Sequence, residues 1–414
     1  MGTSGTHSEF NGQRAEIATN PHRVHRPRRR NSNPILWMDS HASDDAIVLT
    51  ANDAWSAKFA AVDKGYYWDA FLPAFATVSH GNRQSHRHVQ PIIKRGTHAR
   101  VCCMDRAVTS FVELVVARRD PHSPIQVVVL GCGKDTTFFR HQEGRLTSVG
   151  GDEKNAAPNT NSEAPSSSNK VHWFEVDHPA VIQEKASIIR ANPSLFNSSV
   201  EKRTSNCHFR IKPDIYTSYE SECTLLGHDL RNDPEGLMLA LASNGLRADA
   251  PVLFLLECVL MYLPEIATKS LIAALPRHFP QACLCLYEPI LGSDPFGRVM
   301  EQNLRHANVA QNDSCLVQTR TLAQQMQKLR SAGFNGNVVG CDMWAAYESI
   351  VTATQRAQAN RSEFLDELEE WILIMRHYCF VVACTNAASG LGEQLGAVGP
   401  QSVLGFATGK CELM

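Results

Sequence analysis

The stretch "VVVLGCGKDTTFFR", residues 127–140, decides the fold that we expect for this chain. Its apolar run predicts a buried β-strand, and Gly131-Cys132-Gly133 predicts a tight turn that leads into a helix. Glycines at such a turn let backbone N–H groups approach a ligand closely, and the start of the following helix adds positive potential. The stretch therefore favours a nucleotide-like cofactor, although a G-x-G turn also occurs as a purely structural feature.

Further apolar runs follow the first strand, and helical segments separate them. Their hydrophobicity is continuous rather than alternating, which is typical of strands that are covered on both faces. The sequence therefore predicts an α/β fold with a mainly parallel, doubly wound sheet. The expected strands are residues 125–130, 171–177, 224–230, 251–257, 282–288 and about 377–384.

The 414 residues divide by composition into one domain with two unpatterned ends. Residues 1–50 are polar and unpatterned, so we expect a disordered N-terminal extension, and residues 387–414 form a Gly-rich C-terminal tail. The domain between them, residues 51–386, contains an insertion at 147–170 that is low in large apolar residues and rich in Asn, Ser, Gly and Pro. A segment of this composition cannot build a core, so we expect it to be flexible.

Helical patterns occupy residues 51–120 and recur before the last strand. Asp53 is expected to cap the first of one or two short helices, and residues 96–119 predict a longer amphipathic helix. Near the end of the domain, Ser362 is expected to cap a helix that precedes the final strand.

The composition narrows the function classes. A formal net charge of -2 shows no global bias towards nucleic acid or anionic membranes, and the 13 cysteines include no C-x-x-C pair that would indicate a zinc site. From the charge and the cysteine spacing we expect no nucleic-acid partner and no metal. No secretory signal or bilayer-length apolar stretch is found, so we also expect a cytoplasmic protein with no membrane partner. The basic cluster at residues 22–30 is interpreted as a solvated tail, with a nuclear-localisation signal as the alternative.

Acidic residues recur where the predicted strands end. Asp177, Asp229, Glu257 and Glu288 each lie at such a carboxyl end, where doubly wound sheets bind their ligands, so one shared site is expected. Asp177, which ends the second strand, is placed to accept hydrogen bonds from both hydroxyls of a ribose. Its distance along the chain from the glycines exceeds the usual spacing of about 20 residues, and the insertion accounts for the excess. The alternative is that these carboxylates only cap helices.

The glycine turn itself discriminates between cofactors. A dinucleotide needs a cradle for its pyrophosphate, but Thr136 stands where the third glycine would be and Asp135 would repel a diphosphate. S-adenosylmethionine carries no phosphate, and its sulfonium and ammonium groups suit an acid-lined pocket. A nicotinamide-dependent oxidoreductase stays the alternative enzyme class, and an adaptor that keeps only the fold is the non-catalytic alternative.

Several motifs in order carry a resemblance to a known family. They are "LGCGKDTTFFR", "FEVDHPAVIQEKASII", "HDLRN", "LLECVLMYL", "YEPILGSDPFGRVMEQNLR" and "MRHYC", preceded by "KFAAVDKGYYWDAF" and "IIKRGTHARV". This set resembles the leucine carboxyl methyltransferase family, class I S-adenosylmethionine enzymes with a Rossmann-like fold and an N-terminal helical lid. The resemblance spans about residues 53–386. A related branch that modifies a wyosine precursor in tRNA carries kelch repeats, and no such repeat follows Asn386 here.

The resemblance implies contacts with S-adenosylmethionine at motif positions of this chain. The basic lid residues Lys58 and Arg100 would meet its carboxylate, and the turn at Gly131 and Gly133 would pass beside its methionine portion. The ribose would bind Asp177, the adenine would bind Asp229 with Leu230, and the amino group would lie near Glu257.

The resemblance also implies the acceptor, which is the C-terminal leucine α-carboxylate of the protein phosphatase 2A catalytic subunit. Tyr262, Asn303 and Arg305 match positions on the acceptor side, and Arg100 and Tyr262 are the candidate catalytic residues. Tyr262 could instead be a core residue and Arg305 a solvated helix charge. A terminal carboxylate with a pKa of about 3.5 is already ionised at neutral pH, so the reaction needs no general base. Orientation and exclusion of water are then the main tasks of the site.

Overall fold

A nine-stranded sheet forms the centre of the structure, a computed structural model that describes residues 44–76, 89–117, 123–146, 171–203, 207–213, 221–306 and 314–388. The strand order across the sheet is β3-β4-β5-β2-β1-β6-β7-β9-β8. The strands are β1 (Ile125–Leu130), β2 (Val171–Asp177), β3 (Ser198–Arg203), β4 (His208–Pro213), β5 (Glu222–Gly227), β6 (Val252–Glu257), β7 (Ala282–Pro289), β8 (Val338–Asp342) and β9 (Tyr378–Cys384).

Five parallel strands, in the order β5-β2-β1-β6-β7, make up the middle of the sheet. Leu130 at the end of β1 is in register with Val176 of β2 on one side and with Leu256 of β6 on the other. Every residue of β1 and β7 is buried, as expected for strands covered on both faces. The predicted α/β fold with a mainly parallel sheet is confirmed. Because the chain moves from β1 first towards β5 and later back past β1 to β6, the switch point lies at the end of β1.

Antiparallel strands flank the parallel core on both sides. The strands β3 and β4 extend one edge, and β9 and β8 extend the other. Sequence analysis did not predict β3, β4 or β8. The strand β3 has one apolar residue, Val200, and β4 alternates apolar and charged residues. Glu201 and Lys212 of these two strands form an ion pair at 2.9 Å, and the short β8 contains Gly340.

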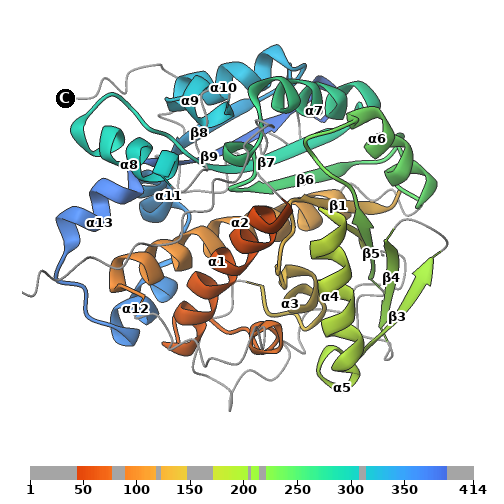
Figure 1. Cartoon of the computed structure of the whole chain (residues 1–414), viewed down its shortest axis with the longest axis horizontal. Coiled ribbons are helices and arrows are strands. Elements are labelled where there is room, and N and C mark those ends of the chain that lie inside the picture. Colours follow the sequence, from red (N-terminus) through yellow and green to blue (C-terminus); the bar gives the residue numbers. More distant parts are fainter. Residues whose placement is uncertain are drawn as a thin grey trace, which may run out of the picture. The chain divides into compact units, whose positions relative to one another are not determined.

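Two layers of helices cover the sheet, one on each face (Figure 1). Side chains of α2, α3, α4 and α11 pack on one face, against alternate strand residues such as Val127 and Trp173. Side chains of α6, α7 and α10 pack on the other face, against Val128 and Phe174. None of the helices in the described ranges is both long and apolar enough to cross a lipid bilayer.

The α-helices are α1 (Asp44–Asp63), α2 (Pro91–Ala117), α3 (Thr137–Gln142), α4 (Pro179–Ala191), α5 (Pro193–Phe196), α6 (Pro234–Ser243), α7 (Glu265–His278), α8 (Pro295–His306), α9 (Cys315–Gln318), α10 (Leu322–Ser331), α11 (Met343–Ser349), α12 (Ala353–Ser362) and α13 (Leu368–Met375), and the 3₁₀ turns are η1 (Leu72–Phe75), η2 (Leu260–Tyr262) and η3 (Asn386–Ala388).

Two helix caps were predicted wrongly. Asp53 lies inside α1, which already begins at Asp44, because no Pro or Gly interrupts the segment before it. The expected extension over residues 1–50 therefore overlaps this helix. Ser362 is the last residue of α12, and its hydroxyl donates to the carbonyl of Gln358 instead of accepting an N–H from a following helix. The rest of that extension, the insertion at 147–170 and the tail from residue 389 lie outside the described residues.

Candidate functional site

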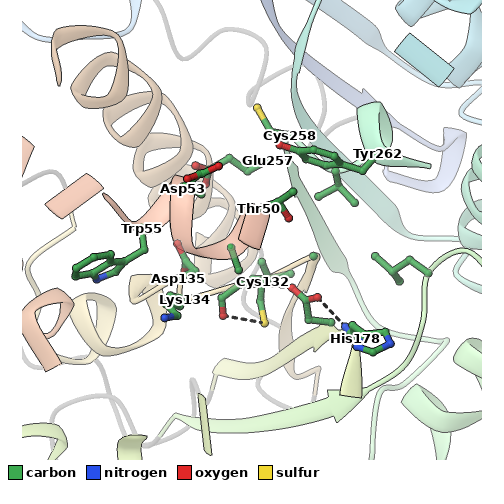
Figure 2. Close-up of a pocket in the computed structure, with 18 of the residues that line it drawn as sticks. Thr50, Asp53, Trp55, Cys132, Lys134, Asp135, His178, Glu257, Cys258 and Tyr262 are labelled. Atoms are coloured by element: carbon green, nitrogen blue, oxygen red, sulfur yellow. Dashed lines mark hydrogen bonds between the residues drawn. The ribbon is translucent and has the colours of Figure 1, made fainter. Parts of the chain in front are cut away.

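A cavity of about 370 Å³ opens at the carboxyl ends of β1, β2, β5 and β6, beneath α1. This volume lies within the range of roughly 300–1,000 Å³ that is usual for small-molecule sites. Figure 2 shows Glu257, Cys258 and Tyr262 on one side of the cavity and Lys134, Cys132 and His178 on the other, with Thr50 of α1 between them. The predicted site residues that line it are Lys58, Arg100, Gly131, Gly133, Asp177, Asp229, Leu230, Glu257 and Tyr262.

The glycine turn after β1 forms the floor of the cavity and is tied to the end of β2. Gly131 has a φ of 71°, and a Cβ atom at this position would lie 2.6 Å from Cγ2 of Val259. Only glycine therefore allows both this conformation and this close approach. The N–H of Gly133 donates to Asp177 Oδ2 at 2.7 Å, so the predicted glycine and acid are in direct contact.

Asp177 is fixed by the backbone on both of its oxygens. Its Oδ1 accepts from the N–H of His178 at 2.7 Å, while Oδ2 accepts from Gly133. Burial raises the pKa of Asp177, and these two hydrogen bonds oppose the rise. A carboxylate offers about four acceptor positions, so two remain for a ligand in the cavity. The expected contact of Asp177 with a ribose stays a prediction.

Four alternating charges form one end of the cavity. Lys58 Nζ on α1 lies 3.0 Å from Asp135 Oδ2 and 3.1 Å from the Glu257 carboxylate. Glu257 Oε1 lies 2.9 Å from Arg100 Nε on α2. Burial lowers the pKa of Lys58, but the two carboxylates outweigh it and leave that pKa raised. For Asp135 burial acts in the opposite direction and raises the pKa, but the charges of Lys58 and Lys185 outweigh it and leave that pKa below its usual value. The carboxylate of Glu257 also raises the pKa of Arg100 despite its burial, so Lys58, Asp135 and Arg100 are charged at neutral pH.

Arg100 retains unused hydrogen-bonding capacity at this end. Its Nη2 is buried and has no hydrogen-bond partner among the described residues. The guanidinium carbon lies 5.5 Å from the ring centre of Tyr287, which supports it from below. A buried donor without a partner is costly, so this nitrogen is suited to a carboxylate that enters the cavity.

Asp229 is held by a neighbour that the sequence did not identify. Arg231 donates to it from its backbone N at 2.9 Å, from Nε at 2.9 Å and from Nη2 at 2.7 Å. Burial raises the pKa of Asp229, but the hydrogen bonds of Arg231 outweigh it and lower that pKa. The strand β5 ends at Gly227, so Asp229 and Leu230 lie in the loop after it. Their expected contact with adenine stays a prediction.

Glu288 was expected in the same acidic group, but it does not line the cavity. Its carboxylate is buried and accepts from the N–H groups of Val259, Leu260 and Met261. Glu288 therefore caps the start of η2, which agrees with the alternative that these carboxylates only cap helices. The reason is register: Glu257 is in register with Tyr287, so Glu288, one residue further along, points to the opposite face of the sheet.

Asn303 and Arg305 on α8 do not line the cavity either. Arg305 pairs with Glu301 at 2.7 Å, and Glu301 also pairs with Arg320 at 2.7 Å. This arrangement agrees with the alternative of a helix charge for Arg305.

Several lining residues were missed by sequence analysis. Thr50, Trp55 and Asp53 come from α1, far along the chain from the motifs of the sheet, so only the packing of that helix reveals them. Lys134, His178, Arg231, Cys258 and Val259 are neighbours of predicted residues, and their adjacency to the strand ends was the available signal. Within the described ranges, no three His, Cys, Asp or Glu side chains are grouped so that they could hold a metal ion.

The fold and the cavity define a doubly wound α/β protein whose ligand site lies at the switch point of the sheet. Comparisons with known proteins specify the family. The family model of leucine carboxyl methyltransferases matches residues 163–275. A Caenorhabditis briggsae protein named "Probable leucine carboxyl methyltransferase 1" is 30% identical over 357 residues, which cover 86% of this chain and 94% of that protein. The chain belongs to the leucine carboxyl methyltransferase family, and the resemblance found in the sequence is confirmed.

Other relatives show the breadth of this likeness. Leucine carboxyl methyltransferase 1 of Yarrowia lipolytica is 26% identical over 82% of this chain and 97% of its own length. The rat tRNA wybutosine-synthesizing protein 4 is 30% identical over 82% of this chain but only 44% of its own length. A solved loganic acid methyltransferase with SAH is 8% identical, with a TM-score of 0.29, over 70% of this chain and 96% of that chain, and so distant a likeness carries no argument.

Proposed function

We propose that this chain transfers a methyl group from S-adenosylmethionine to the α-carboxylate of a C-terminal leucine, and that its acceptor is the protein phosphatase 2A catalytic subunit. The observation that carries the proposal is the charged end of the cavity, where Lys58 and Arg100 alternate with Asp135 and Glu257. Family membership supports the same reaction.

The charged end suits the zwitterionic methionine portion of S-adenosylmethionine. Its carboxylate would bind Arg100, whose Nη2 lacks a partner among the described residues, and Lys58. Its ammonium would bind Glu257 or Asp135. A zwitterionic ligand brings one positive and one negative group, so each charge of the cavity that gives up a protein partner gains a ligand group of opposite sign. A singly charged ligand would leave one buried charge without a partner. The glycine turn and Asp177 would hold the methionine portion and the ribose.

The residues around the acceptor end suit a nucleophile that is already ionised. S-adenosylmethionine supplies an electrophilic methyl group, so that an O–C bond forms as the S–C bond breaks, the electron pair stays on sulfur and no proton is transferred. Arg100 has two candidate ligands, the carboxylate of the cofactor and that of the acceptor. At the acceptor it would orient the carboxylate and neutralise part of its charge in a site shielded from water. Burial raises the pKa of the Tyr262 phenol, so that Tyr262 stays protonated and can donate to a carboxylate but cannot act as a base.

The test is methyl transfer to a phosphatase catalytic subunit, with the modified residue located by mass spectrometry. We expect a single methyl group on the terminal leucine, and none on a subunit that is amidated at its C-terminus or lacks that leucine. An isolated C-terminal peptide should be a poor substrate, because it lacks the remote contacts whose binding energy aligns the transition state. Robust methylation of the amidated subunit would refute the proposal.

A tRNA base is the second candidate acceptor, because the rat tRNA wybutosine-synthesizing protein 4 is as similar in identity as the relative named above. The same assay with tRNA in place of the phosphatase distinguishes the two. Methylated tRNA together with an unmodified phosphatase would favour this second candidate.

A further inference from the structure

The turn that follows β6, residues 258–262 with η2 included, carries two side chains of the cavity wall, and the first of its residues has an unusual backbone conformation. Cys258 has a φ of 54°, in the left-handed region that non-glycine residues rarely adopt. Cys258 and Tyr262 both line the cavity, next to Glu257. A conformation of this kind persists only where the surrounding structure holds it.

Glu288 at the end of β7 is the group that holds the turn. Its Oε1 accepts from the N–H groups of Val259 and Leu260, both at 2.7 Å, and its Oε2 accepts from the N–H of Met261 at 3.2 Å. Three successive backbone donors therefore converge on one carboxylate that is 1% exposed. Hydrogen bonds to an ionised acceptor are the strong ones, and here they replace the helical partners that the first N–H groups of η2 lack.

We propose that Glu288 is a positioning residue for methyl transfer, which fixes the turn 258–262 so that Tyr262 faces the acceptor. This inference rests on the proposed function. Glu288 does not line the cavity, so it acts through the backbone that it binds. The cofactor end of the site depends on it less, because Glu257 is the last residue of β6 and is held by strand pairing and by two cations.

The surroundings of Glu288 make this support sensitive to pH. Burial raises the pKa of Glu288 to about 7, although the three hydrogen bonds and Lys328 oppose the rise. Protonation would turn one acceptor oxygen into a donor that faces N–H groups, so the turn should loosen below this pH. The titratable and charged groups that face Glu288 are Lys328 from α10, Cys315 from α9, Tyr378 and Cys379 from β9, and Cys258 and Tyr262 from the turn region.

The experiment compares Glu288→Gln with the matched control Asp342→Asn. Asp342 also accepts a backbone N–H, from Ala345 at 2.8 Å, but caps α11 and does not line the cavity. In Glu288→Gln one of the two acceptor oxygens is replaced by an NH2 group that faces a backbone donor, so kcat should fall on the order of 10- to 100-fold, as small misplacements at a reacting centre do. The dissociation constant of S-adenosylhomocysteine should stay within about threefold of the wild type.

The pH profile and amide exchange provide two independent readouts. Wild-type kcat should rise through about pH 7, and this step should vanish in Glu288→Gln, because the acceptor carboxylate itself titrates near pH 3.5. Hydrogen exchange of the amides at 259–261 should accelerate about tenfold or more in Glu288→Gln but not in Asp342→Asn.

Each result decides the inference. An unchanged kcat, or equal losses of kcat and cofactor affinity together with a lowered melting temperature, would overturn the positioning role. If wild-type protein methylates no C-terminal leucine, the proposed function fails. Exchange at 259–261 then still decides whether Glu288 holds the turn, and unchanged exchange would overturn that as well.

Discussion

Replacing Asp177 by alanine should weaken the binding of S-adenosylmethionine. In the structure two of the four acceptor positions of its carboxylate are used by Gly133 and His178, each at 2.7 Å, and the other two are available to the cavity. Losing a hydrogen bond to a charged group costs about 1.5–3 kcal/mol, and 1.4 kcal/mol is a factor of about ten. Asp177→Ala should therefore raise the dissociation constant of S-adenosylmethionine by roughly 10- to 150-fold.

The same substitution leaves two backbone N–H groups without their acceptor, so a cost in stability is also expected. It should be about 1–3 kcal/mol if these groups stay dry, and less if water enters the enlarged cavity. Titration calorimetry gives the affinity and thermal unfolding gives the stability. Asp342→Ala is the control, because it removes a carboxylate that caps α11 and does not line the cavity. A dissociation constant of Asp177→Ala within about threefold of the wild type would refute the role of Asp177 in binding.

Three further predictions follow from other parts of the molecule. Arg100→Ala should depress turnover strongly, and Arg100→Lys should restore only part of it because lysine lacks the planar fork of guanidinium; equal kcat for both variants and the wild type would contradict the anchoring role. Deleting residues 151–168 should change neither the melting temperature nor cofactor affinity, because a segment of this composition buries little apolar surface; a large drop in melting temperature would show that the insertion is structured. Burial, helped by Arg95, lowers the pKa of His98 to about 4. Between pH 6.5 and about 4 the unfolded chain therefore binds a proton that the folded chain does not, and the free energy of unfolding should decrease by up to about 1.4 kcal/mol for each pH unit by which the pH is lowered. His98→Gln should flatten that decline, and an unaltered pH dependence of thermal unfolding would count against it.

The parts of the site that the sequence predicts are those that follow directly from strand ends. Gly131, Gly133 and Asp177 could be placed together because parallel strands bring their carboxyl ends to one edge, and in the structure the N–H of Gly133 donates to Asp177. Glu257 and Glu288 looked equivalent in the sequence, since both end an apolar run. Only the register of β6 and β7 shows that they point to opposite faces.

Contacts that depend on packing between distant segments could not be predicted in this way. Lys58 reaches Asp135 and Glu257 only because α1 lies over the strand ends, and nothing in the pattern of α1 specifies that position. The clamp of Arg231 on Asp229 depends on how a loop turns after β5. Strands β3, at the edge of the sheet, and β4, beside it, were missed because their polar and charged residues interrupt the continuous apolar signal of the buried strands.

The most direct test of the central claim uses tritiated S-adenosylmethionine with a folded phosphatase 2A catalytic subunit. A carboxyl methyl ester is labile to alkali, whereas methyl groups on nitrogen or carbon are not, so the label should be released as methanol at high pH. We predict that wild-type protein gives an alkali-labile label which requires the free C-terminal leucine, and that Arg100→Ala gives almost none. A label that survives alkali, or that appears equally on the amidated subunit, would contradict the assignment of a terminal carboxylate as the acceptor.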